Sequence, residues 1–136
     1  MDHIFYSDGN AKKVSWLIQT NDVIIDQNRE HVDIYKDKIS NIQSKYVALH
    51  IGLFWGIGVF VIKNEDHLKI KLDDKIMFEQ LTANLKIKDE FIQNRIKFIN
   101  QLIAQRKLKI EFELILQKDN LANKILVTKE IKTKNG

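Results

Sequence analysis

The stretch KYVALHIGLFWGIGVFVIK, residues 45–63, separates two very different kinds of protein. Between its flanking lysines, His50 is the one strongly polar side chain. The apolar run is close to the shortest length for a membrane-spanning helix, which needs about 20 apolar residues. Gly52 and Gly56 also form the GxxxG spacing that occurs where membrane helices pack together. The run is therefore either a membrane span or the central helix of a soluble domain.

The rest of the chain favours the central helix. Residues 89–104 predict an amphipathic helix, and residues 68–72 (LKIKL) alternate strictly between apolar and polar side chains. Each of these elements has an apolar face that must be buried. A helix enclosed between a sheet and other helices is apolar nearly all round, and glycines let it approach the sheet closely. We therefore expect a buried helix from about residue 40 to residue 58, and no membrane partner.

The other segments predict a single α/β domain over residues 1–136, with a frayed tail at 130–136. A turn is expected at residues 7–10, and Asp119 is expected to cap the last helix. Strands are expected at 3–6, 13–19, 22–26, 68–72 and 109–116, with 31–35 as an addition to the third, and helices at 40–58, 74–81, 89–104 and 119–126. The resulting order, βββ-α-β-α-α-β-α, predicts a mixed five-stranded sheet with helices on both faces.

Composition excludes several classes of function. The chain has 136 residues, no cysteine and a net charge of +4, so disulfides and thiolate metal sites are excluded. The amino terminus does not resemble a signal peptide, and together with the missing cysteines this leads us to expect a cytoplasmic location. The sequence contains no phosphate-binding loop, no dinucleotide fingerprint and no histidine spacing typical of zinc. The positive charge permits a polyanionic partner without requiring one.

Four segments together resemble one known family. Residues 45–53, KYVALHIGL, are similar to the E-Y-x-A-L-x-x-G-L signature in the central helix of type I ribonucleases H, and only the first signature position differs. Residues 5–9 (FYSDG) resemble the opening strand of that family. Residues 68–81 (LKIKLDDKIMFEQL) resemble its fourth strand and the next helix, and 119–126 (DNLANKIL) its final helix. Because the segments occur in the family's order, the resemblance covers almost the whole chain and implies the ribonuclease H-like fold.

The resemblance also implies a chemistry, from which this sequence departs. Type I ribonucleases H cut the RNA strand of RNA–DNA hybrids with two magnesium ions held by four carboxylates. Asp8 and Asp73 match two of these acids, whereas Lys45 and Asn123 stand where the other two are expected. Mg²⁺ prefers anionic oxygen ligands and is repelled by an ammonium group. We therefore predict that Lys45 lies between the two aspartates, that no cofactor is needed, and that neither Mg²⁺ nor Mn²⁺ supports hydrolysis.

Other interpretations of the acidic residues remain open. Asp8 is also typical of a turn before glycine, and Asp74 of a helix N-cap. An active enzyme could instead use a rearranged acid cluster that binds Mg²⁺ or Mn²⁺ through Asp8, Asp73 and Asp74. Other acids near in sequence that such a cluster could recruit are Glu79 and Asp119.

Basic residues around the long helix are candidates for phosphate contacts. They are Lys86, Lys88, Arg106, Lys107 and Lys109. Such residues add salt-dependent affinity for nucleic acid, but cations at a helix end are equally explained by the helix dipole. The expected function is an inactive ribonuclease H-like module that binds nucleic acid (RNA–DNA hybrid or RNA) or a protein partner. The sequence does not determine the oligomeric state.

Overall fold

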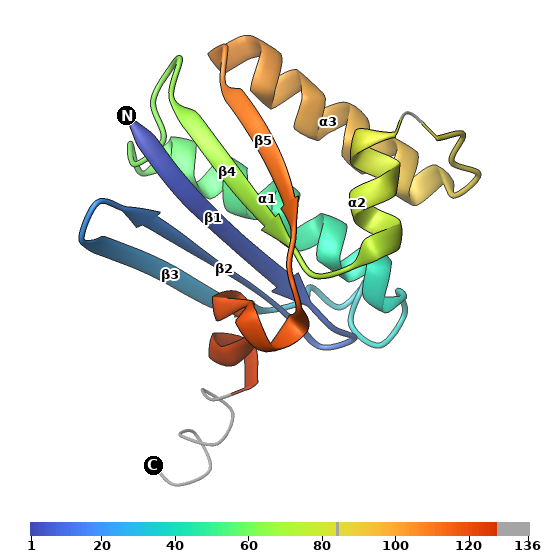
Figure 1. The fold of residues 1–136 in the computed structure, drawn as a ribbon. Coiled ribbons are helices and arrows are strands. Elements are labelled where there is room, and N and C mark those ends of the chain that lie inside the picture. Colours follow the sequence, from blue (N-terminus) through green and yellow to red (C-terminus); the bar gives the residue numbers. More distant parts are fainter. Residues whose placement is uncertain (84, 128–136) are drawn as a thin grey trace, which may run out of the picture.

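The computed structural model describes residues 1–83 and 85–127, and its elements follow the predicted order (Figure 1). The strands are β1 (Asp2–Gly9), β2 (Lys13–Thr20), β3 (Val23–Glu30), β4 (His67–Leu72) and β5 (Lys109–Leu114). The helices are α1 (Asn41–Gly58), α2 (Lys75–Thr82) and α3 (Glu90–Arg106), followed by a short 3₁₀ helix (Gln117–Asp119) and helical residues 121–127. The strands form one sheet in the order β3-β2-β1-β4-β5.

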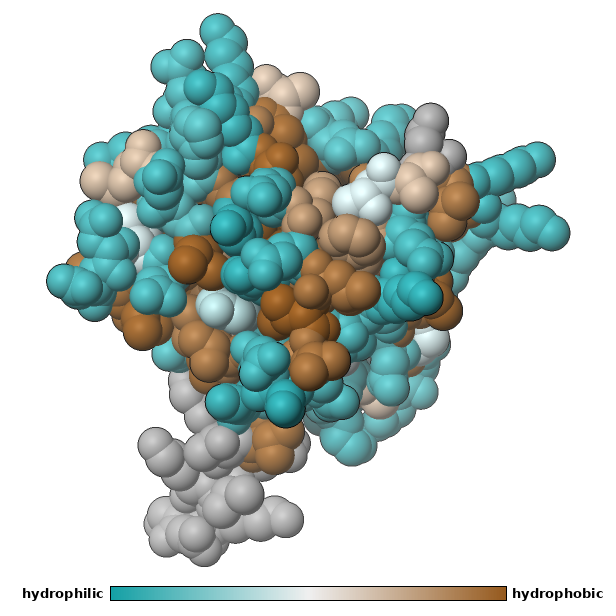
Figure 2. Space-filling model, in the orientation of Figure 1, coloured by the Kyte–Doolittle hydropathy of each residue, from teal (hydrophilic) through white to brown (hydrophobic). Residues whose placement is uncertain are grey.

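The sheet is mixed, and helices cover it on both faces, as predicted. β1, β2 and β3 pair antiparallel, whereas β4 lies parallel to both β1 and β5. α1 packs on β1 and β2, and α3 packs on α1 behind the sheet in Figure 1. On the opposite face, the Ser15 hydroxyl donates to the Ala122 carbonyl at 2.7 Å and holds helix 121–127 in place. The remainder of that face is mostly hydrophilic, with apolar residues between the polar ones (Figure 2).

The apolar run forms α1 and ends at Gly58, where it was predicted to end. Ser40 and Gln43 make a reciprocal capping box at its start. Along the helix, Leu49 and Leu53 are fully buried. At Gly52 an added Cβ would lie 2.7 Å from the Phe5 ring, so glycine is what allows the helix to approach the sheet so closely. Within residues 1–83 and 85–127, no helix has both the length and the hydrophobicity of a transmembrane span.

The predicted boundaries are wrong in the first hairpins. β1 continues to Gly9, so Asp8 lies in a strand and not in a turn. β3 continues beyond residue 26 to Glu30, and residues 31–39 form turns and not a strand. Both corrections have the same physical cause. β2 offers hydrogen-bonding partners along its whole length, so β1 pairs as far as Gly9 opposite Val14, and the polar residues of β3 pair as far as Glu30 opposite Lys13.

The cap of the last helix was also predicted wrongly. Asp119 belongs to the 3₁₀ helix, and the side chain of Asn120 accepts from the Ala122 N–H at 3.0 Å. Asn120 serves as the cap because its backbone is extended, as is typical of an N-cap, whereas Asp119 lies within the 3₁₀ helix. The predicted tail, residues 130–136, lies outside the described residues.

Candidate functional site

Two neighbouring parallel strands bring Asp8 and Asp73 to the same end of the sheet. β1 and β4 are in register with Tyr6 opposite Lys71, so both strands end at the two aspartates. The start of α1 passes directly over this end. A Cβ on Gly9 would lie 2.7 Å from the Ser44 carbonyl oxygen, so only glycine lets the strand come so close to the helix. This approach brings Lys45, the next residue of α1, above both carboxylates.

Lys45 bridges the two aspartates, as the sequence predicted. Its ammonium donates to Asp8 Oδ1 at 2.7 Å and to Asp73 Oδ1 at 2.8 Å. The side chains are 18% exposed for Lys45, 3% for Asp8 and 4% for Asp73. Burial alone lowers the pKa of Lys45, but the charges and hydrogen bonds of the two aspartates outweigh it, and the net pKa is raised. Lys45 is therefore a firmly held cation at neutral pH.

Amide N–H groups also donate hydrogen bonds to the two carboxylates. The Asn123 side chain donates to Asp8 Oδ2 at 2.7 Å, and the Gly9 N–H donates to Asp8 Oδ1 at 2.8 Å. The Asn120 side chain donates to Asp73 Oδ2 and to the Ser7 carbonyl, both at 3.0 Å. Each carboxylate oxygen of the pair thus accepts at least one hydrogen bond from the chain itself. We call Asp8, Asp73, Lys45, Asn120 and Asn123 the lysine-bridged network.

Asn120 is the member of this network that sequence reasoning missed. It is fully buried and also caps the last helix. The available signal was the pair of asparagines in DNLAN, since residues three apart lie on the same side of a helix start. Asn123 was identified from the family resemblance alone, and the same spacing would have pointed to Asn120.

The residues at this end do not fit a pair of divalent cations. Such a pair, about 3.5–4 Å apart, needs several anionic oxygens, whereas here an ammonium lies between the only two carboxylates of the network. The described residues contain no cluster of three or more His, Asp or Glu side chains that could hold a metal.

The additional acids named from the sequence serve other purposes. Asp74 caps α2 by accepting from the Met77 N–H at 2.9 Å, and Glu79 lies 4.0 Å from Lys75. Asp119 lines a neighbouring cavity that also includes Asp73. A cleft of about 490 Å³ is lined by every member of the lysine-bridged network except Asn120, and its walls also include Asp74 and Val127.

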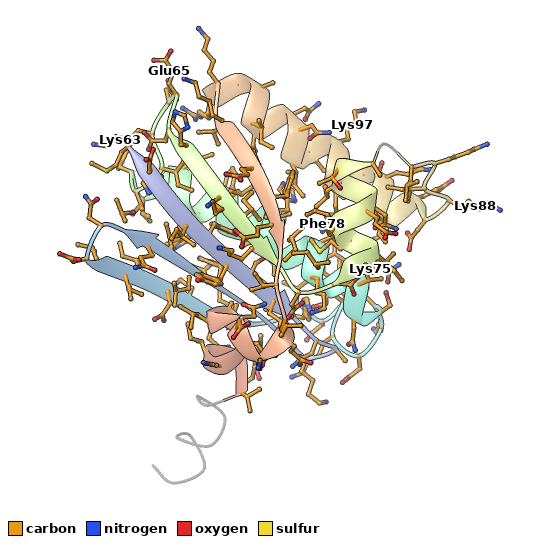
Figure 3. The ribbon with its side chains drawn as sticks, in the orientation of Figure 1. Lys63, Glu65, Lys75, Phe78, Lys88 and Lys97 are labelled. Carbon is orange, nitrogen blue, oxygen red and sulfur yellow. The ribbon has the colours of Figure 1, made fainter. Side chains whose placement is uncertain are left out.

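The predicted basic residues form two separate groups. Lys86 and Lys88 precede α3, whereas Arg106, Lys107 and Lys109 follow it, and all five are exposed. The 17 residues of α3 correspond to about 25 Å of helix between the groups. Figure 3 shows Lys88 at one end of the molecule and Lys63 and Glu65 at the other. The structure therefore does not bring the five residues together into one phosphate-binding surface.

Comparison with known proteins agrees with this fold. Residues 8–129 match the reverse transcriptase-like family, whose members have a ribonuclease H-like domain. The chain belongs to this ribonuclease H-like family. No protein with a curated description matches it.

Solved structures of ribonuclease H-like proteins superpose over nearly the whole chain. The RNase H1 of Halobacterium salinarum NRC-1 has a TM-score of 0.77 and 16% identity, with 98% of this chain and 99% of that chain covered. The N-terminal RNase H domain of a Mycobacterium tuberculosis protein has a TM-score of 0.73 and 15% identity, covering 98% and 96%. LC11-RNase H1 in complex with an RNA/DNA hybrid has a TM-score of 0.73 and 17% identity, covering 98% and 99%. At these identities the likeness establishes the fold.

Proposed function

We propose that this ribonuclease H-like protein binds nucleic acid without hydrolysing it. The observation that carries the proposal is the ammonium of Lys45, held between Asp8 and Asp73. In the family that the sequence resembles, the corresponding space holds magnesium, and the residue at the position of Lys45 is an acid. A lysine there removes a ligand and introduces a charge that repels the metal.

The asparagines add to this effect. A metal ligand must present a lone pair, but Asn123 and Asn120 direct their N–H groups at the aspartates. Binding of Mg²⁺ would require displacement of the ammonium and reorientation of both amides. It would also require Mg²⁺ to give up tightly held water for only two carboxylates. Each of these changes opposes metal binding, and together they favour a metal-free state.

The exposed surface supports a nucleic acid ligand. The chain has a net charge of +4, and its exposed basic residues include Lys86 and Lys88 before α3 and Arg106, Lys107 and Lys109 after it. LC11-RNase H1, which shares this fold, has been solved with an RNA/DNA hybrid. Backbone phosphates are recognised by lysine and arginine without any catalytic metal, so binding can persist where hydrolysis is lost.

The test is an RNA–DNA hybrid cleavage assay with the full chain in Mg²⁺ and in Mn²⁺. We expect no cleavage above a no-protein blank, no rise in the melting temperature with Mn²⁺, and salt-dependent binding of the hybrid in EDTA. The matched variant is Lys45→Glu combined with Asn123→Asp, in which Mn²⁺ should raise the melting temperature. Cleavage by the wild-type chain that disappears in Asp8→Asn would disprove the proposal, because that loss assigns the activity to this site.

A further inference from the structure

At the end of the molecule opposite the lysine-bridged network, an aromatic residue has a backbone conformation that is unfavourable for any residue with a side chain. Phe60 follows the end of α1 and has a φ of 65°. Its N–H donates to the Ile57 carbonyl and the Val61 N–H to the Gly56 carbonyl, at 3.1 and 3.0 Å, which is the Schellman helix ending. Glycine is preferred at this position because a side chain makes the left-handed conformation costly. The backbone alone therefore favours glycine and not phenylalanine at position 60.

Packing does not account for this ring either. Phe60 is 79% exposed, the highest value among the large hydrophobic side chains that the structure describes. Phe54 and Val59, near the same end of α1, are also exposed, at 64% and 45%. Single exposed apolar side chains are normal on a protein surface, but three within residues 54–60 are typical of a surface that binds a ligand.

Three exposed cations lie in the loop after Phe60 and at the end of α3 to which this loop is bonded. The Glu65 N–H donates to the Arg106 carbonyl at 2.8 Å, and this bond ties the loop after α1 to the end of α3. Lys63, Arg106 and Lys107 are exposed, and within the described residues none of them makes an ion pair. Glu65 is the exposed acid of the loop and is labelled beside Lys63 in Figure 3. We call Phe60, Lys63, Arg106 and Lys107 the Phe60 surface; its net charge is positive.

The neighbouring acid does not neutralise these cations. Asp66 is buried and already accepts from the amino group of Met1 at 3.2 Å and lies 2.7 Å from the His3 ring. It also accepts from the Lys63 backbone N–H at 2.8 Å, whereas the Lys63 ammonium makes no ion pair within the described residues. The positive charge of the Phe60 surface is therefore available to an anion.

We propose that the Phe60 surface binds single-stranded nucleic acid, with a base stacked on Phe60 and phosphates against the three cations. A flat ring beside cations matches a chain in which flat bases alternate with phosphates. A single strand is favoured over a duplex because the bases inside a duplex already stack on one another. A lipid surface fits less well, since the cations stand beside the ring and only a few apolar side chains could insert. The inference rests on the proposed nucleic acid binding, but not on the loss of hydrolysis.

The test measures fluorescence anisotropy of a labelled oligothymidylate with the full chain in EDTA. Phe60→Gly should bind about 5- to 140-fold more weakly, the range expected for one lost base–aromatic stack. Its melting temperature should stay the same or rise, because glycine relieves the left-handed backbone. Weaker binding together with an unchanged or higher melting temperature would show that the affinity is lost with the ring and not through misfolding. Phe60→Trp should retain the affinity, and Ile34→Ala, which alters another highly exposed apolar side chain, should not change it.

The cations are tested through salt dependence. Lys63→Gln and Arg106→Gln should each reduce the slope of log affinity against log salt by about 0.7. The matched control is Lys97→Gln, which removes an exposed charge from the middle of α3 and should leave the slope unchanged.

Three results would overturn the inference, and the first two concern the dependence of binding on Phe60. One is equal oligothymidylate affinity in Phe60→Gly and the wild type. The other is Phe60-dependent binding to anionic phospholipid vesicles together with Phe60-independent binding to the oligonucleotide. Hybrid binding that survives in Phe60→Gly, with no single-strand binding by the wild type, would reject this surface alone. Hybrid cleavage by the wild type would reject the proposed function and leave the single-strand result interpretable.

Discussion

Charged side chains are buried and paired at one end of the sheet, in the lysine-bridged network, and exposed at the other end, in the Phe60 surface. At one end, Asp8, Asp73 and Lys45 are largely buried, and every carboxylate oxygen has a partner within the chain. At the other end, Lys63 and Arg106 are exposed and unpaired within the described residues, beside the most exposed aromatic ring. A polar group whose partners are internal has little to offer a ligand. From this comparison we propose that the first end stabilises the fold and that the second end binds a ligand.

Removing one lysine from each end is the strongest test of this comparison. Lys45→Met leaves two buried carboxylates without their cation and should cost about 3–5 kcal/mol of unfolding free energy. Lys63→Met removes an exposed, unpaired charge and should change the free energy by no more than about 0.5 kcal/mol. Urea denaturation of both variants at neutral pH measures the difference. Equal losses would show that the two ends do not differ as described.

Alkaline pH should weaken the lysine-bridged end selectively. The pKa of Lys45 is raised above its ordinary value of 10.5 in the folded state, because the attraction of Asp8 and Asp73 exceeds the effect of burial. The folded chain therefore keeps this proton at a pH where the unfolded chain has lost it. The stabilisation is complete below pH 10.5 and is lost as the pH rises through the folded pKa, by up to about 1.4 kcal/mol for each pH unit.

The measurement is the difference in unfolding free energy between the wild type and Lys45→Met, followed from neutral pH to about pH 12. Other lysines and tyrosines titrate in both proteins and cancel in the difference. A difference that stays constant across this range would mean that the proton on Lys45 does not contribute to stability.

The sequence predicted those features of the fold that depend on neighbours in the chain. The start of α1 near residue 40, its end near Gly58 and the alternation in β4 are local patterns, and each was confirmed. The position of Lys45 was inferred because a family resemblance placed it beside two acids from distant segments. No local pattern could have supplied that placement.

The features that were missed depend on contacts between distant segments. Asn120 joins the network through Ser7 and Asp73, which are 113 and 47 residues away in sequence. The left-handed backbone of Phe60 could not be inferred because Gly58, two residues earlier, is the expected helix terminator. The basic residues on either side of α3 were treated as one set in the sequence, but the length of the helix separates them into two groups in space.

The smallest predicted effects come from the two asparagines, which test whether the first end acts as one unit. Asn120→Ala should cost about 2 kcal/mol, because it removes a helix cap and leaves the buried Ser7 carbonyl and Asp73 short of a donor. Asn123→Ala should cost about 1 kcal/mol, because Asn123 is only half-buried and its side chain donates one hydrogen bond to Asp8. If the network is coupled, Asn120→Ala combined with Lys45→Met should deviate from additivity by more than about 0.5 kcal/mol, whereas Asn120→Ala combined with Lys63→Met should be additive. Additivity in both pairs would mean that each contact stabilises the fold independently, and the contrast between the two ends would then lie in burial alone.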